Sequence, residues 1–413
     1  MDKTVIELFA GVGGFRVGLN EVESFDEKGH AIEKNNFKFV WANQWEPSTK
    51  LQHAFDCYNL RFHENFNSNV DISLIDKKQI PNHSLLCGGF PCQDYSVAHS
   101  LSKSRGIEGK KGVLWWQIRD ILIAKKTPFV FLENVDRLVK SPAKQRGRDF
   151  GIMLRCFDDL GYAVEWRIIN AADYGFPQRR RRIYIFAYKK ETSYYERISK
   201  ASANEVILTK GIFAKEFPLN NKETNLHESN LKEFTDLVDF SDNYKFSFEN
   251  SGYMNNGVVY TAKTTPLLVS PVTLGQIAEG NVDEHFYLDD NKKTKFNYLR
   301  GSKKIARKDS NGHKYTYSEG AMSPYDDLSL PGRTMLTSEG SINRSTHIIK
   351  DPITNRLRLL TPIECERLNQ FPDNWTNSGM PEKKRYFMMG NALVCGIIRK
   401  LGAEIKRIIE NEK

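Results

Sequence analysis

Long apolar runs are missing from this sequence. No segment reaches the about 20 consecutive apolar residues that a membrane-spanning helix requires, so we expect no membrane partner. Residues 1–4 lead directly into a strand-like segment and do not resemble a secretory signal. Together these absences predict a cytoplasmic protein.

Cysteines are few, and no two of them form a CxxC pair. Without such spacing we expect no structural metal site, and in a reducing compartment we expect no disulfide bonds. Free thiols are mostly small core residues, and this is the interpretation for all but Cys92. The six cysteines are Cys57, Cys87, Cys92, Cys156, Cys365 and Cys395.

The chain has an excess of positive charge. Its 413 residues include 60 Lys and Arg against 51 Asp and Glu, a formal net charge of +9. Such an excess suits a protein that displaces counterions from a phosphate backbone, although it also serves general solubility. The length allows one large domain and a smaller second one.

Apolar strand-like runs alternate with helical periodicity over the first 190 residues. Four such runs lie at 5–9, 39–42, 85–87 and 129–132, and residues 164–169 and 183–187 form a closing pair of strands. This alternation predicts an α/β fold with a doubly wound, mostly parallel sheet. We expect a catalytic and cofactor-binding domain at 1–190, a smaller, irregular, β-leaning target-recognition domain at 191–350, and a return of the chain to the first domain at 351–413.

A glycine-rich turn follows the first predicted strand. Phe9, Gly11, Gly13 and Gly14 lie where a doubly wound sheet binds a nucleotide-type cofactor, and glycines let the backbone approach a ligand closely. Arg16 replaces the third glycine of GxGxxG, which weakens a dinucleotide interpretation. An ordinary glycine-rich turn remains the alternative.

The second predicted strand ends at Gln44, Trp45 and Glu46. An acid at this place accepts hydrogen bonds from ribose hydroxyls, and Trp45 could stack on an adenine ring. In the other interpretation Trp45 is a core residue and Glu46 begins a helix. Asp71 and Ile72 follow as a weaker pair that could contact the adenine.

Two reactive groups follow the third and fourth strands. Pro91 and Cys92 come directly after a strand end, where a nucleophile is displayed at the mouth of such a sheet. Glu133 follows four consecutive apolar residues, so partial burial would raise its pKa and allow it to donate a proton. A helix cap at Asn134 with an incidental acid is the alternative.

Four arginines open the last strand of the first domain. After Gln178, strand alternation sends Arg180 and Arg182 to one face, where two guanidinium groups suit a phosphate or a carbonyl oxygen. Alone, this run would indicate a solvated basic patch.

Taken in order, these segments resemble the cytosine-5 DNA methyltransferase family of bacterial restriction–modification type. The resemblance covers about 4–187 and 357–398 and leaves out the middle, where this family varies. Its motifs are FAGVGGF at 9–15, FPCQ at 90–93, ENV at 133–135, QRRRRI at 178–183, LLTPIEC at 359–365 and GNA at 390–392.

The resemblance implies that the cofactor is S-adenosyl-L-methionine. The residues implied to surround it are Phe9, Gly11, Gly13, Asp71, Ile72, Pro91, Leu114, Asn391 and Ala392. The family commonly has an acid at the position of Gln44, so either Gln44 or Glu46 must serve the ribose. It often has Ser at the position of Ala392, a small change.

The resemblance also implies the reaction, which is methylation of carbon 5 of cytosine in double-stranded DNA. Cys92 would add to carbon 6 of a flipped base, and Glu133, Gln178, Arg180 and Arg182 would hold the base and its phosphate. Residues 93–112 resemble the family's mobile catalytic loop. A partner restriction endonuclease and a monomeric enzyme are implied by the family alone.

Three alternatives stay open. A tRNA cytosine-5 methyltransferase would share the catalytic segments, and the long middle region argues for DNA. A catalytically silent binding module would have no use for Cys92, and a nicotinamide-dependent oxidoreductase would need the missing glycine. For groove contacts, the expectation falls on residues 331–344.

Overall fold

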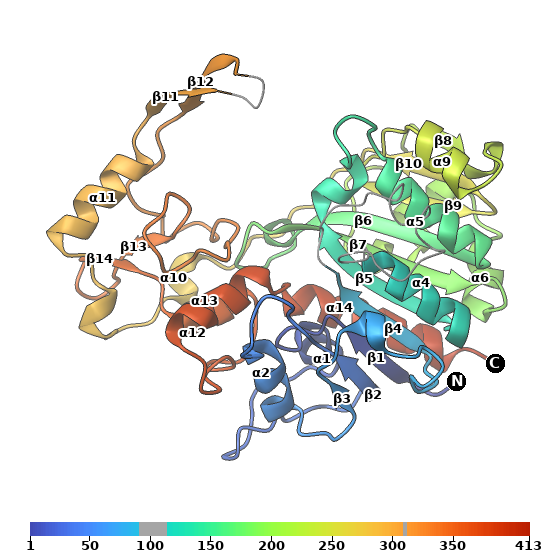
Figure 1. The fold of residues 1–413 in the computed structure, drawn as a ribbon, viewed down its shortest axis with the longest axis horizontal. Helices are drawn as coiled ribbons and strands as arrows, with labels where there is room; N and C mark the ends of the chain where they lie inside the picture. The colour runs from blue at the N-terminus through green and yellow to red at the C-terminus, as the bar shows by residue number, and fades with distance from the viewer. Residues whose placement is uncertain (91–113, 309–311) are drawn as a thin grey trace.

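The computed structural model describes residues 1–90, 114–308 and 312–413, and a ten-stranded sheet runs through its larger lobe (Figure 1). The strand order is β3-β2-β1-β4-β5-β7-β6-β9-β10-β8. The strands are β1 (Thr4–Leu8), β2 (Lys38–Asn43), β3 (Asn67–Ser68), β4 (Leu85–Gly89), β5 (Phe129–Val135), β6 (Tyr162–Asn170), β7 (Arg181–Lys189), β8 (His227–Asn230), β9 (Ser251–Asn255) and β10 (Val258–Ala262).

Helices cover both faces of this sheet. The five strands from β3 to β5 pair in parallel, and their side chains alternate between two apolar cores. Phe129 and Phe131 enter the core that holds α1 (Gly14–Leu19), α2 (His53–Arg61) and α14 (Cys395–Glu410), whereas Val130 and Leu132 enter the core that holds α4 (Leu114–Lys125) and α5 (Arg148–Asp159). The predicted α/β, doubly wound fold is confirmed.

The sheet continues with antiparallel strands beyond β5. β7 and β6 form the predicted closing pair, and β9, β10 and β8 extend the sheet through residue 262. The sheet therefore does not end at the domain boundary expected near residue 190. Short helical segments connect these strands: α6 (Ser193–Ile198), α7 (Ala203–Glu205), the π-helix η4 (Val206–Lys210), α8 (Ile212–Glu216), η5 (Leu231–Glu233) and α9 (Leu237–Asn243).

A smaller lobe is built from residues 263–359 and stands beside the sheet (Figure 1). Its apolar cluster is small and centres on Leu288, Phe296 and Ile348. Buried Arg358 adds ion pairs to Asp351 at 2.8 Å and to Glu364 at 2.7 Å. Its elements are α10 (Leu274–Ile277), η6 (Glu284–Phe286), α11 (Asp290–Arg300), the β11 (Lys303–Lys308) and β12 (Lys314–Glu319) hairpin, and the β13 (Ile348–Lys350) and β14 (Leu357–Leu359) pair.

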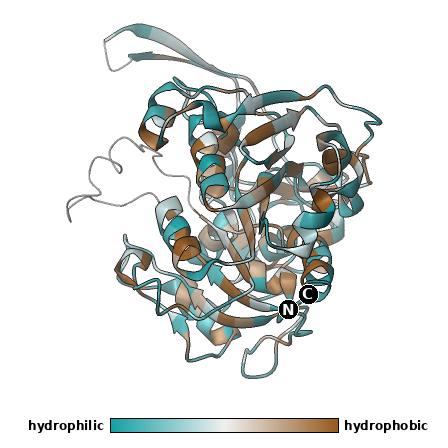
Figure 2. Cartoon of the chain, turned by 90° about the vertical axis from the view of Figure 1, so that its right-hand side faces the viewer, coloured by the Kyte–Doolittle hydropathy of each residue, from teal (hydrophilic) through white to brown (hydrophobic). Residues whose placement is uncertain are grey.

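The last helices bring the chain back to the larger lobe. α12 (Pro362–Leu368) begins with the predicted capping box of Thr361 and Glu364, α13 (Glu382–Asn391) follows, and α14 lies against α1. A Cβ on Gly18 would lie 2.5 Å from Cβ of Ile398, so this close approach requires glycine. In Figure 2 the strands of the sheet carry much of the apolar colour.

Two further observations concern the part of the chain that the structure describes. Within residues 1–90, 114–308 and 312–413, no helix combines the length and apolar character that crossing a membrane requires. The five cysteines expected to be core residues are all buried.

Candidate functional site

The glycine-rich turn joins β1 to α1 through three residues with positive φ. Phe9 has φ 52°, Gly11 57° and Gly13 89°. A Cβ on Gly11 would meet nothing within 4 Å, whereas one on Gly13 would lie 2.5 Å from Phe62. The turn is therefore packed on its Gly13 side and open at Gly11, as a turn that cradles a ligand must be.

Gln44 and Glu46, the two candidate acceptors for the cofactor ribose, follow β2 and have different surroundings. Oε1 of Gln44 accepts a hydrogen bond from the Gly11 N–H at 2.7 Å, so this oxygen is engaged in holding the turn. The carboxylate of half-buried Glu46 has no hydrogen bond or ion pair within the described residues, and burial raises its pKa. Trp45 is 37% exposed. Within the described residues, the Glu46 carboxylate is thus free to accept hydrogen bonds from a ligand.

The other expected cofactor residues come from several different elements. Oδ1 of Asp71 caps the 3-10 helix η1 (Ile72–Leu74) by accepting from the Ser73 N–H, and Ile72 is buried. Exposed Asn391 is the last residue of α13, half-buried Ala392 follows it, and the next residue, Leu393, packs on Gly14. Leu114 begins α4. Pro91, Cys92 and the loop at 93–112 lie outside the described residues.

Glu133 lies near the end of β5, beside the point where the chain leaves towards Cys92. It pairs in register with Gly89 on β4, and the Asn134 side chain donates to the Phe90 carbonyl at 2.9 Å. Arg182 of β7 forms an ion pair with Glu133, Nε to Oε1 at 2.9 Å. Both side chains are mostly buried, at 12% and 16% exposed.

Burial raises the pKa of Glu133, and the charges of Arg182 and Arg180 only partly offset this effect. A carboxyl group held in this way is suited to donate a proton or a strong hydrogen bond. This is the property that the sequence predicted for Glu133.

Gln178 and Arg180, which the resemblance implies hold the target base and its phosphate, are both buried between the two lobes. Oε1 of Gln178 accepts from the Met335 N–H at 3.1 Å, and its Nε2 donates to Oδ1 of Asn369 at 3.0 Å. Arg180 donates to the carbonyls of Met335 at 3.1 Å and Gly390 at 2.9 Å. Burial lowers the pKa of Arg180 to about 9. Of the expected pair, Arg182 reaches Glu133, while Arg180 joins segments of the fold.

Two contacts in this arrangement were not predicted from the sequence. The backbone of 177–179 pairs with Gly332, which fixes the smaller lobe against the larger one. Nε1 of Trp375 donates to the Val12 carbonyl at 2.8 Å and so holds the glycine-rich turn from behind. Partners 150 to 360 residues apart leave no local signal in a sequence.

The segment at 331–344 was expected to contact DNA grooves. Its two arginines instead make contacts within the smaller lobe. Arg333 forms an ion pair with Asp326, and Arg344 donates to the Leu299 and Gly301 carbonyls. These contacts make both arginines part of the lobe's framework.

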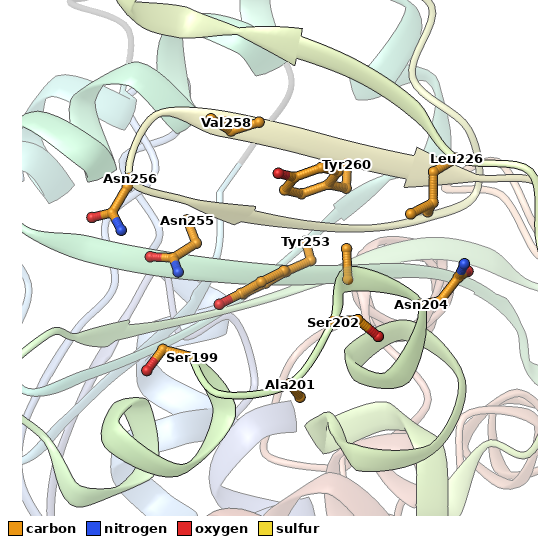
Figure 3. Close-up of a pocket in the computed structure, with 11 residues that line it drawn as sticks. Ser199, Ala201, Ser202, Asn204, Leu226, Tyr253, Asn255, Asn256, Val258 and Tyr260 are labelled. Carbon is orange, nitrogen blue, oxygen red and sulfur yellow. The ribbon is translucent and has the colours of Figure 1, made fainter.

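A cavity of about 520 Å³ lies on the larger lobe between β9–β10 and residues 199–204 (Figure 3). Tyr253, Tyr260, Ser199 and Asn255 line it, and no charged residue does. β9 lies three strands along the sheet from β5, and none of the predicted site residues borders this cavity. The cavity is therefore separate from the residues predicted for the site.

Comparison with known proteins agrees with this geometry. Residues 3–407 match the family described as C-5 cytosine-specific DNA methylase. The chain is 51% identical to the type II methyltransferase M.Sau3AI of Staphylococcus aureus, over 98% of this chain and 95% of that protein. It is 32% identical to the type II methyltransferase M.HhaI of Haemophilus parahaemolyticus, over 45% of this chain and 49% of that one.

Solved structures support the fold. The methyltransferase EhMeth of Entamoeba histolytica has a TM-score of 0.57 at 16% identity, covering 100% of this chain and 99% of that one. S. pombe Dnmt2 methyltransferase has a TM-score of 0.59 at 15% identity and covers 99% of each chain. Since the family match spans nearly the whole chain and the relative at 51% identity does too, this protein belongs to the C-5 cytosine-specific DNA methylases and is a DNA methyltransferase.

Proposed function

We propose that this enzyme transfers a methyl group from S-adenosyl-L-methionine to carbon 5 of cytosine within a specific double-stranded DNA sequence. The observation that supports this most directly is the mostly buried Glu133–Arg182 pair, beside the strand end from which the chain leaves towards Cys92. An acid of raised pKa, together with the thiol expected at Cys92, suits addition to a pyrimidine ring.

The residues around the glycine-rich turn fit the cofactor. Gly11 leaves open space, the free carboxylate of Glu46 can accept from ribose hydroxyls, and exposed Trp45 offers a ring face to adenine. Asp71 and Asn391 would complete the pocket. When bound, S-adenosyl-L-methionine supplies an electrophilic methyl group on its sulfonium.

The chain's own residues would then prepare the base. Because carbon 5 of cytosine is a weak nucleophile, addition of the Cys92 thiolate at carbon 6 makes it electron-rich. Glu133 would donate a proton or hydrogen bond to N3, and Arg182 would hold Glu133 in place. Loss of the carbon 5 proton after methylation expels the thiolate. The base must be flipped out for this, at a cost of a few kcal/mol.

The biological setting is part of the same proposal. M.Sau3AI and M.HhaI are both named type II methyltransferases. By this likeness, we infer that the enzyme protects host DNA from a partner restriction endonuclease. It would act in the cytoplasm as a monomer, since one chain carries every residue that the site uses.

Covalent trapping tests this proposal. The protein is incubated with S-adenosyl-L-methionine and mixed-sequence duplex DNA in which 5-fluorocytosine replaces cytosine. Fluorine at carbon 5 blocks the final elimination, so we expect a denaturation-resistant adduct that mass spectrometry maps to Cys92. Cys92→Ser, which keeps the other five thiols, is the matched control and should bind cofactor without forming the adduct.

Other outcomes would redirect the proposal. An adduct on fluorinated tRNA and none on DNA would identify an RNA enzyme. Cofactor binding with no adduct on either nucleic acid would indicate a silent module. An adduct at a different thiol would remove Cys92 from its role.

A further inference from the structure

The β11–β12 hairpin projects from the smaller lobe as a separate arm in both views (Figures 1 and 2). Ten of its twelve strand residues are exposed, and the two that are half-buried, Lys303 and Glu319, lie at its base. A two-stranded hairpin is at best marginally stable when it stands alone in water. Because the arm neither contributes to a core nor covers one, packing within this chain does not explain it.

The base of the arm is held firmly. Lys303 donates to the Leu299 carbonyl at 3.1 Å, and Arg344 donates to the carbonyls of Leu299 and Gly301 and forms an ion pair with Glu319 at 3.3 Å. These contacts join the arm to the end of α11. The smaller lobe therefore fixes the direction in which the arm points.

The register separates the residues of the arm into two different faces. Partners across an antiparallel pair share a face, and neighbours along a strand alternate. One face carries Lys304, Lys308 and Lys314 among small neutral residues, namely Ala306, Thr316 and Ser318. The other carries Ile305, Tyr315, Tyr317 and Arg307, with the Arg307 guanidinium 4.1 Å from the Tyr317 ring centre.

The lysine face carries charge that no described acid neutralises. Within the described residues, Lys304, Lys308 and Lys314 make no ion pair, and no acid shares their face. Lys308 and Lys314 stand directly opposite each other, an arrangement that like charges make unfavourable. A polyanion laid along this face would remove that repulsion.

The dimensions of the face fit duplex DNA. Lys304 and Lys308 are four residues apart on one strand, about 13 Å at about 3.3 Å per residue. Successive phosphates of one DNA strand rise about 3.4 Å each along the axis, so the face spans several of them. The arginines of 331–344, by contrast, are used inside the lobe.

We propose that the β11–β12 arm binds the phosphate backbone of duplex DNA through Lys304, Lys308 and Lys314, independently of base sequence. This inference rests on the proposed function, because it assigns part of the DNA contact to a named surface. The arm would raise the affinity of the enzyme for any duplex and leave discrimination between sequences to other residues.

The test is the triple variant Lys304→Gln, Lys308→Gln and Lys314→Gln in the full-length protein. Affinity for two 30-base-pair duplexes, one that the wild type methylates and one that it does not, is measured against NaCl concentration. With each lost phosphate contact removing about 0.9 from the slope of log K against log salt, we expect the slope to fall by about 2.7. Affinity near 0.15 M salt should fall about tenfold to a hundredfold for both duplexes.

A matched control removes the same charge where the parallel strands begin, opposite the site. Lys38 opens β2, Lys126 precedes β5, Lys413 ends the chain, and all three are exposed. Lys38→Gln, Lys126→Gln and Lys413→Gln together should leave the slope near the wild-type value. Cofactor affinity, measured by calorimetry, should be the same in all three proteins and reports that each is folded.

Three results would overturn the proposal. The arm variant could match the control in slope and affinity, it could weaken one duplex and spare the other, or it could change the oligomeric state in sedimentation, which would make a second copy the partner. The fluorocytosine adduct of the wild type separates this failure from that of the proposed function. If the wild type forms the adduct and the arm variant binds DNA normally, the proposed function is supported and the proposal for the arm is refuted. A wild type that binds no duplex would refute both proposals.

Discussion

Replacing Gln178 with leucine should loosen the junction between the two lobes. Leucine keeps most of the side-chain volume but removes every side-chain hydrogen bond of a residue that is 0% exposed, including the two shortest, with Met335 and Asn369. The Met335 N–H would lose its acceptor, and Oδ1 of Asn369 would lose its donor. Both partners are fully buried, so water cannot replace what is lost without local opening.

The magnitude follows from these two orphaned groups. A buried polar group without a partner costs about 1–3 kcal/mol, so the pair should cost about 2–6 kcal/mol. At about 1.4 kcal/mol per factor of ten, local opening of the junction should become about 30-fold to 10⁴-fold more frequent.

Hydrogen exchange measures this opening where it occurs. A peptide covering residues 332–336 contains the Met335 amide and should exchange much faster in the variant, while peptides of β1 and β4 keep their protection. Thr334→Val is the matched control, because it removes an exposed hydrogen bond from the same segment to the Arg179 carbonyl. Unchanged exchange together with a lower kcat would refute the reasoning and return Gln178 to the target base, as the sequence suggested.

Three further predictions concern carboxyl groups. Glu133→Gln should lower the single-turnover methylation rate about 10²-fold or more with unchanged cofactor affinity, whereas an unaltered rate would make Glu133 a structural acid. Glu46→Gln should raise the Kd for S-adenosyl-L-methionine about tenfold or more in calorimetry, since a hydrogen bond to a charged group is lost; a normal Kd would assign the ribose to Gln44 instead. Burial raises the pKa of Glu7 to about 8, above its ordinary value of 4.5. Between these pH values the folded protein keeps a proton on Glu7 that the unfolded chain releases. The free energy of unfolding should therefore fall as pH rises from about 4.5 to 8. Glu7→Gln should flatten that fall in thermal melts, and an equally steep fall would place the titration elsewhere.

The sequence could predict that the candidate site residues share one edge of the sheet, because parallel strands expose their carboxyl ends along one edge. The glycine-rich turn follows β1, Glu46 follows β2 and Glu133 lies near the end of β5, so order along the chain was enough to bring them together. What each side chain does there could not be predicted. Gln44 and Glu46 differ because Oε1 of Gln44 accepts a hydrogen bond from the Gly11 N–H. Such a contact depends on side-chain positions that a sequence does not give.

The burial of Gln178 and Arg180 shows more sharply what a sequence cannot predict. Alternation correctly relates residues two apart, but burial depends on what covers them, and the cover comes from Met335 and Gly390, more than 150 residues later. The extension of the sheet by β9 and β10 was missed for a similar reason. Those strands lie in a polar stretch and gain their order from pairing with β6.

The chemistry of arginine and lysine explains why net charge alone does not locate the surface that we propose for DNA. A guanidinium group is planar and offers several donors, so it can satisfy several acceptors at once inside a lobe that has little apolar core, as Arg333 does with Asp326 and the Ser345 carbonyl. A lysine ammonium is compact and strongly hydrated, and it remains at the surface, as Lys304 does on the arm. Arg333→Lys should therefore destabilise the lobe, whereas Lys304→Arg should preserve DNA affinity. Basic residues that form ion pairs within the fold must therefore be subtracted before an excess of positive charge is taken as a sign of DNA binding.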